Sequence, residues 1–234
     1  MTVLTDLQCR TAWAITNIFE GSSPRGHYEA VAILKDGAGI SYGRAQGTDR
    51  SGTLDRIVMR YVEKKGQYAH ALMPFLDELD RDETIAEPHP PWVDQLCDLL
   101  RKAAADPLMR QAQDEIFATG YWDPAVAQGQ RLGLELPLSY AVLYDLHIQS
   151  GAGRVARLRR GFDEVPPSNG GDEKAWVRAL NEARRAWLSS HSRQVVRNSV
   201  YRAEEFAEMM AIDSCWHLTL PLFCRGVTIT EDVL

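Results

Sequence analysis

Residues 19–43 read FEGSSPRGHYEAVAILKDGAGISYG, and they form the one stretch of this chain with the character of β-structure. An apolar run, a D-G-A-G turn and a short segment with Ile40 and Tyr42 follow one another, which predicts a small hairpin or ribbon. A helical pattern precedes the run and ends near Glu20 and Gly21. Two carboxylates, those of Glu20 and Asp36, therefore flank the junction between a helix and a β-element.

The rest of the chain has mostly helical periodicity, with about nine helices expected. Apolar residues at three- and four-residue spacing predict a first helix from about Leu4 to Glu20. The segment PLSYAVLYDLHIQSG (137–151) is apolar almost all round, which predicts a buried central helix that ends at Gly151. Within 49–66 a helix is expected with Ser51 as its N-cap. Further helices are expected at about 67–80, 92–104, 107–119, from Asp123, 172–189 and 192–211, and residues 216–229 are expected to form an extended tail.

The composition is that of a soluble globular protein with a sizeable core. The chain has 234 residues, of which 45% are hydrophobic and 25% charged, enough for one large domain or two lobes that share a groove. Its net charge of −6 argues against a nucleic-acid partner and suits a cationic polymer. The basic stretch RVARLRRG (154–161) has helical spacing and is most simply a solvated helix face.

The sequence predicts neither a metal site nor a cofactor. Four scattered cysteines, Cys9, Cys97, Cys215 and Cys224, form no CxxC pair, so buried free thiols are expected, with two disulfides as the alternative. The six histidines show no HExxH pattern or other i, i+4 pairing. GAGISYG (37–43) lacks the Lys-Ser/Thr that a phosphate-binding loop needs, and no G-x-S-x-G elbow is present.

The first residues, MTVLTDLQCRTAWAITN, have the spacing of an amphipathic helix. They lack a basic segment followed by a continuous apolar core, so neither a signal peptide nor a membrane span is expected. We therefore expect a protein made in the cytoplasm that reaches the periplasm or cell wall by a route other than general secretion.

Glu20 and Asp36 suit the two roles of glycoside hydrolysis, which needs an acid for the leaving oxygen and a carboxylate on the opposite face. Glu20 follows Ile18 and Phe19 at a helix C-terminus, where an apolar setting and the helix dipole favour a protonated acid. Asp36 lies in a glycine turn that solvent would reach, which suits an ionised base, and the hydroxyl of Ser41 could hold a water. Alternatively, both acids are ordinary cap and turn residues.

Several motifs in order resemble those of a known family. AITNIFEGSSPRGHYEAVAILKDGAGISYG (14–43) resembles the N-terminal region of the family 46 glycoside hydrolases, the chitosanases of the lysozyme-like superfamily. YWDPAV (121–126) is similar to that family's Y-F-D-P-A-V, and YDLHIQSG (144–151) is similar to its Tyr-Asp helix. Arginine-bearing segments at 179–188 and 193–202 have counterparts in the same order, so the resemblance spans about residues 10–203.

The resemblance implies a mainly α, two-lobed lysozyme-like α+β fold with a small β-hairpin or sheet near the N-terminus. It implies a single catalytic domain over residues 1–234, in which two lobes flank a substrate cleft. Inverting, endo-acting cleavage of β-1,4 bonds in an amino-sugar polymer is expected. The carboxyl groups of Glu20 and Asp36 should then lie about 6.5–9.5 Å apart, since a separation near 5 Å favours a covalent intermediate.

The same resemblance implies roles for individual residues. Glu20 matches the general acid and Asp36 the general base, while Ser41 stands where the family has a threonine that orients the attacking water. Asp145 and one or both of Arg197 and Arg202 match a buried charge network that contacts the acid.

The sugar-contacting positions are less uniform. Tyr28, Tyr42 and Trp122 are candidates for stacking on a sugar, although each could equally belong to the core. Thr53 stands where the family has an aspartate that binds the amino group of chitosan, and Ala38 replaces a common arginine.

These two departures leave three functional alternatives. The main hypothesis is a lysozyme-like hydrolase of bacterial peptidoglycan, such as an endolysin or an antibacterial effector with an immunity or delivery protein as partner. A chitosanase is the close alternative, which the resemblance and the acidic charge support. The third is a carbohydrate-binding or interaction protein without catalysis.

Overall fold

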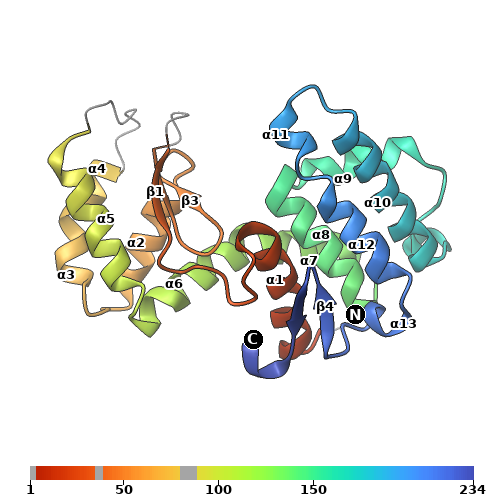
Figure 1. The fold of residues 1–234 in the computed structure, drawn as a ribbon, viewed down its shortest axis with the longest axis horizontal. Coiled ribbons are helices and arrows are strands. Elements are labelled where there is room, and N and C mark those ends of the chain that lie inside the picture. The colour runs from red at the N-terminus through yellow and green to blue at the C-terminus, as the bar shows by residue number, and fades with distance from the viewer. Residues whose placement is uncertain (1–3, 35–38, 80–88) are drawn as a thin grey trace. The chain divides into compact units, whose positions relative to one another are not determined.

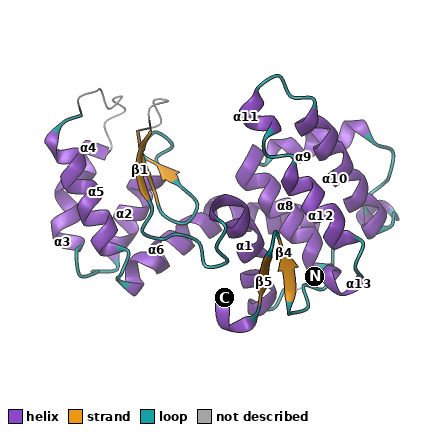
Figure 2. Ribbon diagram, viewed as in Figure 1, coloured by secondary structure: helices purple, strands orange, loops and turns teal. Residues whose placement is uncertain are grey.

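The structure is a computed structural model, and it describes residues 4–34, 39–79 and 89–234. The chain divides into two compact units. The larger, called the helical unit, consists of the residues up to Arg25 together with Tyr121–Leu234, and the smaller unit is Gly26–Gly120. Figures 1 and 2 show that helices dominate, with a small antiparallel sheet in the N-terminal part of the chain. The predicted fold class is therefore confirmed.

Helix α1 (Asp6–Gly21) has well-defined signals at both ends. At its start the Thr5 hydroxyl accepts from the amide of Gln8, and the Gln8 side chain accepts from the amide of Thr5, which is a capping box. At its end Ser22 has a left-handed φ of 58° and donates its N–H to the Ile18 carbonyl. This cap fixes Glu20 in the last turn of the helix, as the sequence predicts.

The small sheet contains β1 (Val31–Leu34), β2 (Gly39–Tyr42) and β3 (Gly47–Thr48), all antiparallel in that order. In this register Ser41 lies opposite Ala32 on one side and Thr48 on the other. The predicted hairpin is present, and β3 is an additional strand. Asp36 and Ala38 lie outside the described residues.

The smaller unit packs its helices around a stripe on α2 (Thr53–Glu63). Leu54, Ile57, Val58 and Tyr61 on α2 are fully buried. The helix expected at 67–80 is instead broken, because Pro74 lacks a backbone N–H and fits only the first turn of a helix. The remaining helices are α3 (Ala69–Leu72), η1 (Met73–Phe75), α4 (Leu76–Leu79), α5 (Pro91–Ala103) and α6 (Pro107–Phe117).

The helical unit is built around α8 (Pro137–Ser150). Every residue from Pro137 to His147 is buried, which agrees with the nearly uniform apolar character of this segment. Helices α1 and α7 pack on α8, and α10 packs on α12 (Figure 1). Element η2 (Ala118–Trp122) crosses the boundary between the two units. The other helices of the helical unit are α7 (Asp123–Leu132), α9 (Gly153–Leu158), η3 (Arg159–Gly161), η4 (Pro167–Asn169), α10 (Glu173–Ser189), α11 (Gln194–Arg197), α12 (Tyr201–Met210) and α13 (Asp213–Trp216).

The structure differs from the sequence prediction at the C-terminal end in two respects. The helix expected at 192–211 is split into α11 and α12, because Ser199 directs both its amide and its hydroxyl to the Val196 carbonyl. The expected extended tail instead contains α13, a hairpin of β4 (Leu222–Cys224) and β5 (Val227–Ile229), and η5 (Glu231–Val233). Arg225 and Gly226 both have positive φ in the tight turn of this hairpin.

Arg25 joins the segment after α1 to the end of the chain. Its guanidinium donates to the backbone carbonyls of Asp232 and Val233.

Among the described residues, no helix combines the length and apolar character that a membrane crossing requires.

Helices α7 and α8 approach each other closely at Gly129. A Cβ at Gly129 would lie 2.5 Å from Cε1 of Tyr140, and that ring is held because its hydroxyl donates to the Leu134 carbonyl. We expect Gly129→Ala to lower the free energy of unfolding by about 1–3 kcal/mol through overpacking. The control is Gly153→Ala in α9, where the space is open, and we expect a change of at most about 1 kcal/mol, in the stabilising direction. Equal denaturation midpoints for the two variants would contradict the close packing.

Candidate active site

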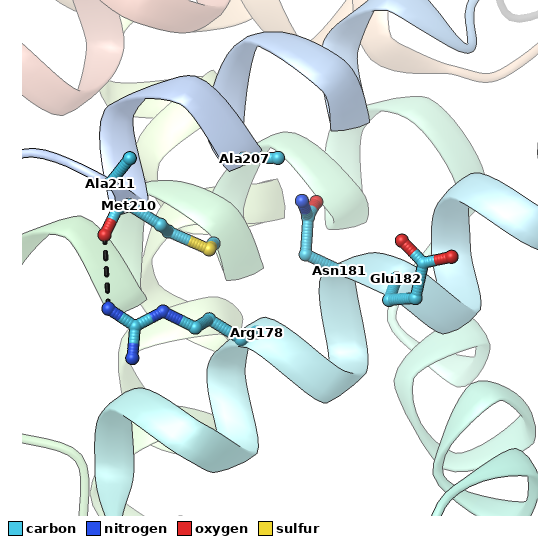
Figure 3. Close-up of a pocket in the computed structure, with 6 residues that line it drawn as sticks. All are labelled: Arg178, Asn181, Glu182, Ala207, Met210 and Ala211. Atoms are coloured by element: carbon cyan, nitrogen blue, oxygen red, sulfur yellow. Dashed lines mark hydrogen bonds between the residues drawn. The ribbon is translucent and has the colours of Figure 1, made fainter.

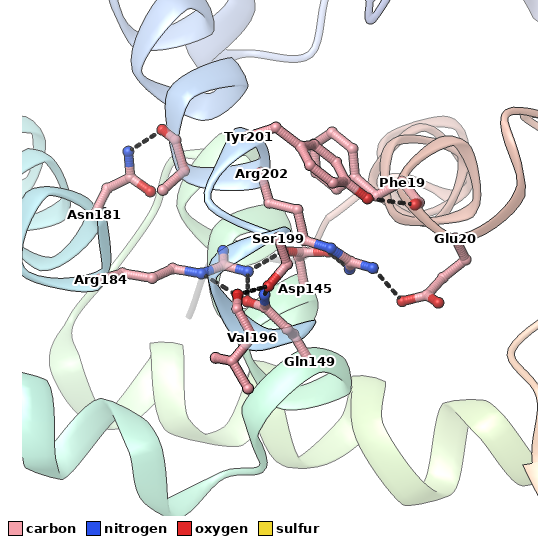
Figure 4. A network of polar contacts seen from close by, with 11 residues as sticks. Phe19, Glu20, Asp145, Gln149, Asn181, Arg184, Val196, Ser199, Tyr201 and Arg202 are labelled. Carbon is pink, nitrogen blue, oxygen red and sulfur yellow. Dashed lines mark hydrogen bonds and ion pairs between the residues drawn. The ribbon is translucent and has the colours of Figure 1, made fainter. Parts of the chain in front are cut away.

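Glu20 projects from the last turn of α1 and remains within reach of solvent. Its side chain is 24% exposed, and Oε1 accepts a hydrogen bond from Nη2 of Arg202 at 2.6 Å (Figure 4). A guanidinium that holds one carboxyl oxygen restricts the rotamer of the side chain. The other oxygen, Oε2, is then the atom that can exchange a proton with a bound molecule.

Arg202 connects Glu20 to a buried charge network. Its side chain is 7% exposed, and Nη1 donates to Oδ1 of Asp145 at 2.8 Å. The other carboxylate oxygen of Asp145 accepts from Nη2 of Arg184 at 2.5 Å, and both of these side chains are fully buried. Two carboxylates and two guanidinium groups thus alternate from Glu20 into the core, so each buried charge faces an opposite one.

The charges determine how firmly Arg202 keeps its proton. Burial alone would lower the pKa of Arg202, but the negative charges of Asp145 and Glu20 outweigh it and raise that pKa above its usual value. Burial lowers the pKa of Arg184, against the opposing effect of Asp145. Since a guanidinium stays protonated in proteins, Glu20 faces a permanent cation.

Aromatic side chains fix the backbone at the end of α1. Phe19 packs edge-on against Tyr201 and Phe206, with ring centroids 5.9 and 5.4 Å apart. The Tyr201 hydroxyl donates to the Phe19 carbonyl at 2.8 Å, which satisfies one of the free carbonyl groups at the helix end. The guanidinium of Arg225 lies 3.9 Å from the centroid of the Tyr201 ring. Helix α12 therefore sets the position of Glu20 in two ways: Arg202 holds the Glu20 side chain, and Tyr201 holds the backbone of Phe19.

Arg197 lies apart from this network. It donates to the carbonyls of His191 and Ser192 and to the side chain of Gln194, and so holds the turn before α11. Of the two arginines that the sequence left open, Arg202 is the one that contacts both Glu20 and Asp145.

Arg184 is a network residue that the sequence analysis did not single out. It lies on the buried face of α10, in series with Val177, Leu180 and Leu188 at three- and four-residue spacing. An arginine at a core position of an amphipathic helix requires a buried acceptor. The position of Arg184 in this apolar pattern could have predicted a buried arginine, although it does not identify Asp145 as the partner.

The elements on either side of Asp36 belong to the smaller unit. Ser41 lies within β2 and is almost fully buried. At the start of β2, the Asp49 carboxylate accepts from the amides of Ile40 and Arg50 and occupies the place of a side chain at Gly39, whose φ is +72°. Burial raises the pKa of Asp49. Asp49 therefore fixes the first residues of β2, while Asp36 and its distance from Glu20 lie outside what the structure describes.

Two of the aromatic candidates lie in the core and so are not placed to stack on a sugar. Tyr42 is fully buried and its hydroxyl donates to the Leu100 carbonyl at 2.9 Å. Trp122 is 7% exposed and packs edge-on against Trp13 and Tyr144. Sequence spacing alone does not separate an aromatic residue in a cleft from one in a core.

Of the other two candidate contacts, Tyr28 lies nearer the surface, whereas Thr53 is buried with 8% exposure. Tyr28 is partly exposed, and its hydroxyl donates to Asp114 at 2.9 Å. Thr53 is the first residue of α2, and its hydroxyl accepts from Ser51 at 2.9 Å. Its role in the structure is at the start of a helix.

The four cysteines, Cys9, Cys97, Cys215 and Cys224, are free, and all but Cys9 are buried. This agrees with the expectation of buried free thiols over disulfides. Within residues 4–34, 39–79 and 89–234, no cluster of three or more His, Cys, Asp or Glu side chains is arranged to hold a metal ion.

A pocket of about 310 Å³ lies between α10 and α12, away from the predicted site residues (Figure 3). Arg178 spans it and donates to the Met210 carbonyl at 3.1 Å. Asn181 donates to the Ala203 carbonyl, and its own side-chain oxygen is closed off from solvent. The pocket is lined by Arg178, Asn181, Glu182, Ala207, Met210 and Ala211.

Residues 14–222 match the family model described as Glycosyl hydrolase family 46. The chain belongs to this family. The chitosanase of Bacillus subtilis (strain 168) is 29% identical to this family 46 enzyme over 230 residues, covering 94% of the chain and 82% of the relative. The chitosanase of Streptomyces sp. (strain N174) is 24% identical over 169 residues, covering 69% of the chain and 59% of the relative.

Solved structures agree with this assignment over nearly the whole chain. The Gynuella sunshinyii chitosanase in complex with chitotetraose superposes with a TM-score of 0.81 at 25% identity, covering 97% of this chain and 98% of that one. A Glu-to-Ala variant of the chitosanase from Bacillus subtilis MY002, complexed with 6 GlcN, gives 0.78 at 27% identity, with coverages of 95% and 96%. The resemblance inferred from sequence is confirmed, and this family 46 protein is a glycoside hydrolase.

Asp145 is the acceptor that both buried arginines share, and its removal tests the network. We expect Asp145→Asn to lower the free energy of unfolding by about 3–5 kcal/mol, because the buried Arg184 loses its counter-charge and Arg202 keeps only that of Glu20, while the side-chain shape is kept. Chemical denaturation monitored by circular dichroism measures this.

The matched control is Glu182→Gln, which removes the acid of the solvent-exposed pair with Arg185 and should leave the denaturation midpoint nearly unchanged. If both variants unfolded at the same denaturant concentration, the buried network would not contribute to stability as described.

Proposed function

We propose that this family 46 enzyme hydrolyses the β-1,4 bonds of chitosan at internal positions by inverting acid–base catalysis. The observation that carries the proposal is the ion pair of Glu20 with Arg202, backed by Asp145, in a chain that matches the family over residues 14–222. This arrangement gives a carboxyl group with one oxygen fixed by a cation and the other near solvent. Such a group is suited to deliver a proton in a defined direction.

In the proposed reaction, a water attacks the anomeric carbon of the sugar while Asp36 accepts the proton of that water. The bond between this carbon and the glycosidic oxygen breaks, and Glu20 donates a proton from Oε2 to the leaving oxygen. The hydroxyl of Ser41 is assigned to orient the water. Afterwards Glu20 takes up a proton and Asp36 releases one, which restores the starting state.

Chitosan is preferred over peptidoglycan as the substrate because the relatives described above are chitosanases. The net charge of −6 also suits a polymer whose glucosamine units carry positive charge. The peptidoglycan hypothesis relied on Thr53 and on the lack of a predicted signal peptide. The hydrogen bond between Ser51 and Thr53 at the start of α2 accounts for Thr53 without reference to a sugar. These relatives give no support to an antibacterial effector, an endolysin or an immunity partner.

The wild-type enzyme should convert soluble chitosan into glucosamine oligomers, and Glu20→Gln should lose this activity by about 10²–10⁴-fold, because an amide cannot donate the required proton. Reducing-end assays with mass spectrometry of the products measure the cleavage. Viscosity should fall early relative to reducing-end formation if cleavage is internal. Proton NMR of fresh products should show the α-anomer first if the configuration is inverted.

The control for this substitution is Glu182→Gln, an isosteric change on the exposed face of α10 that should keep wild-type activity. Purified bacterial sacculi form the second substrate arm. Release of muropeptides by the wild type would favour a wall hydrolase, and no cleavage of either polymer would favour a binding protein. Full activity of Glu20→Gln would remove Glu20 from the role of acid, and an initial β-anomer would indicate a covalent intermediate.

A further inference from the structure

The charge network behind Glu20 continues beyond Arg184 to an uncharged side chain. The side-chain oxygen of Gln149 accepts from Nε of Arg184 at 3.1 Å and also from Nη2 of the same group. The amide nitrogen of Gln149 donates to Oγ of Ser199 at 2.5 Å. The Ser199 hydroxyl in turn donates to the Val196 carbonyl at 2.7 Å. Gln149 therefore has a partner on both sides of its amide (Figure 4).

These bonds close a ring that includes the backbone of Arg202. The Ser199 carbonyl accepts from the Arg202 amide at 3.2 Å, so Ser199 contacts Gln149 through its side chain and Arg202 through its main chain. Asp145 joins Arg202 to Arg184, and Gln149 joins Arg184 back to Ser199. Asp145 and Gln149 lie four residues apart on α8 and so share one face of that helix.

Gln149 takes hydrogen bonds from Arg184 without contributing a charge. Arg184 is fully buried, and Nη2 is shared between Asp145 and Gln149. The amide thus competes with Asp145 for one guanidinium group. Asp145 also accepts from Nη1 of Arg202, whose other terminal nitrogen holds Glu20.

We propose that Gln149, supported by Ser199, is a positioning residue that sets how Asp145 is shared between Arg184 and Arg202, and through Arg202 adjusts the proton affinity of Glu20. The proposal rests on the proposed role of Glu20 as the acid.

The charges of the network predict whether replacing Gln149 raises or lowers the proton affinity of Glu20. Without the amide oxygen, Arg184 directs its donors at Asp145 and draws this carboxylate away from Arg202. The positive charge of Arg202 is then less compensated and favours the ionised form of Glu20. A carboxylate at the same place has the opposite effect, because it binds Arg184 and leaves Asp145 to Arg202.

Other charged and titratable groups surround the ring and stay unchanged in these variants. Tyr201 interacts electrostatically with both Arg184 and Arg202. The buried thiol of Cys224 interacts electrostatically with Glu205, Arg225 and Asp145. Burial raises the pKa of Cys224, so this thiol is neutral around the ring. In the part of the chain that the structure describes, Glu20, Tyr201 and Cys224 interact with charged members of the ring, and Glu205 and Arg225 interact with Cys224.

The test compares pH–rate profiles of Gln149→Leu, Gln149→Glu and Ser199→Ala on a soluble glucosamine oligomer. An acid that must be protonated sets the alkaline limb of the profile. We expect this limb to move down by about half a pH unit in Gln149→Leu and up by a similar amount in Gln149→Glu. In Gln149→Leu kcat should fall about three- to tenfold with little change in KM, and Ser199→Ala should shift the limb in the same direction by less. The control is Gln111→Leu at an exposed position of α6, which should keep the wild-type profile.

A second measurement separates this proposal from the proposed function. The side-chain carboxyl of Glu20 is followed by carbon NMR in glutamate-labelled protein, with its signal assigned by Glu20→Gln. Its titration should move in opposite directions in Gln149→Leu and Gln149→Glu, whichever polymer the enzyme cleaves. Unchanged titration, or a shift of the same sign in both variants, overturns the proposal even if chitosan is hydrolysed. If Gln149→Leu does not fold, the near-isosteric Gln149→Glu and Ser199→Ala decide the question by the same readouts.

Discussion

The rest of the helical unit depends on the two ion pairs of Arg202, one with Glu20 and one with Asp145. One nitrogen of its guanidinium holds Glu20 at the end of α1, and another holds Asp145 in the middle of α8. Buried charges of this kind add little to stability compared with apolar side chains, but each becomes costly once its partner is lost. The packing of α1, α8, α10 and α12 is therefore constrained by a requirement to bring charges together as well as by apolar burial. Glu20 is the one member of the chain of charges that reaches solvent appreciably.

Local patterns predicted the elements that depend on local physics. The apolar spacing before Glu20, the glycine turn after Leu34 and the uniform apolar character of 137–147 gave α1, the hairpin and the buried helix. The family resemblance then supplied the meaning of Glu20, which spacing alone left open. It also predicted a charge network behind Glu20, and the structure identified Arg202 as the arginine that contacts Glu20. The choice between Arg197 and Arg202 is resolved only by the turn at Ser199, because this turn orients Arg202 toward the core and Arg197 toward the preceding loop.

Features that depend on distant partners were missed or misjudged. Arg184 looked like one of many arginines, and Gln149 had no signal beyond lying one turn after Asp145. Tyr42 and Trp122 were considered for sugar stacking because an aromatic side chain has the same signature in a cleft as in a core. The substrate hypothesis gave weight to one position, Thr53, where the chain departs from the family. Similarity over nearly the full chain outweighs such a single difference, since recognition of a polymer depends on many contacts.

The helical unit is discontinuous in sequence, and this affects the order in which the site can form. Helix α1 belongs with residues that follow Tyr121, so the smaller unit is in effect an insertion after Arg25. During synthesis α1 is made before the rest of the helical unit, because its packing partner α8 begins at Pro137 and Arg202 comes later still. The contacts that fix Glu20 span 182 residues, which makes loop closure costly and slow. The smaller unit has its own core and can fold earlier, whereas the acid acquires its fixed geometry only after α12 has been synthesised.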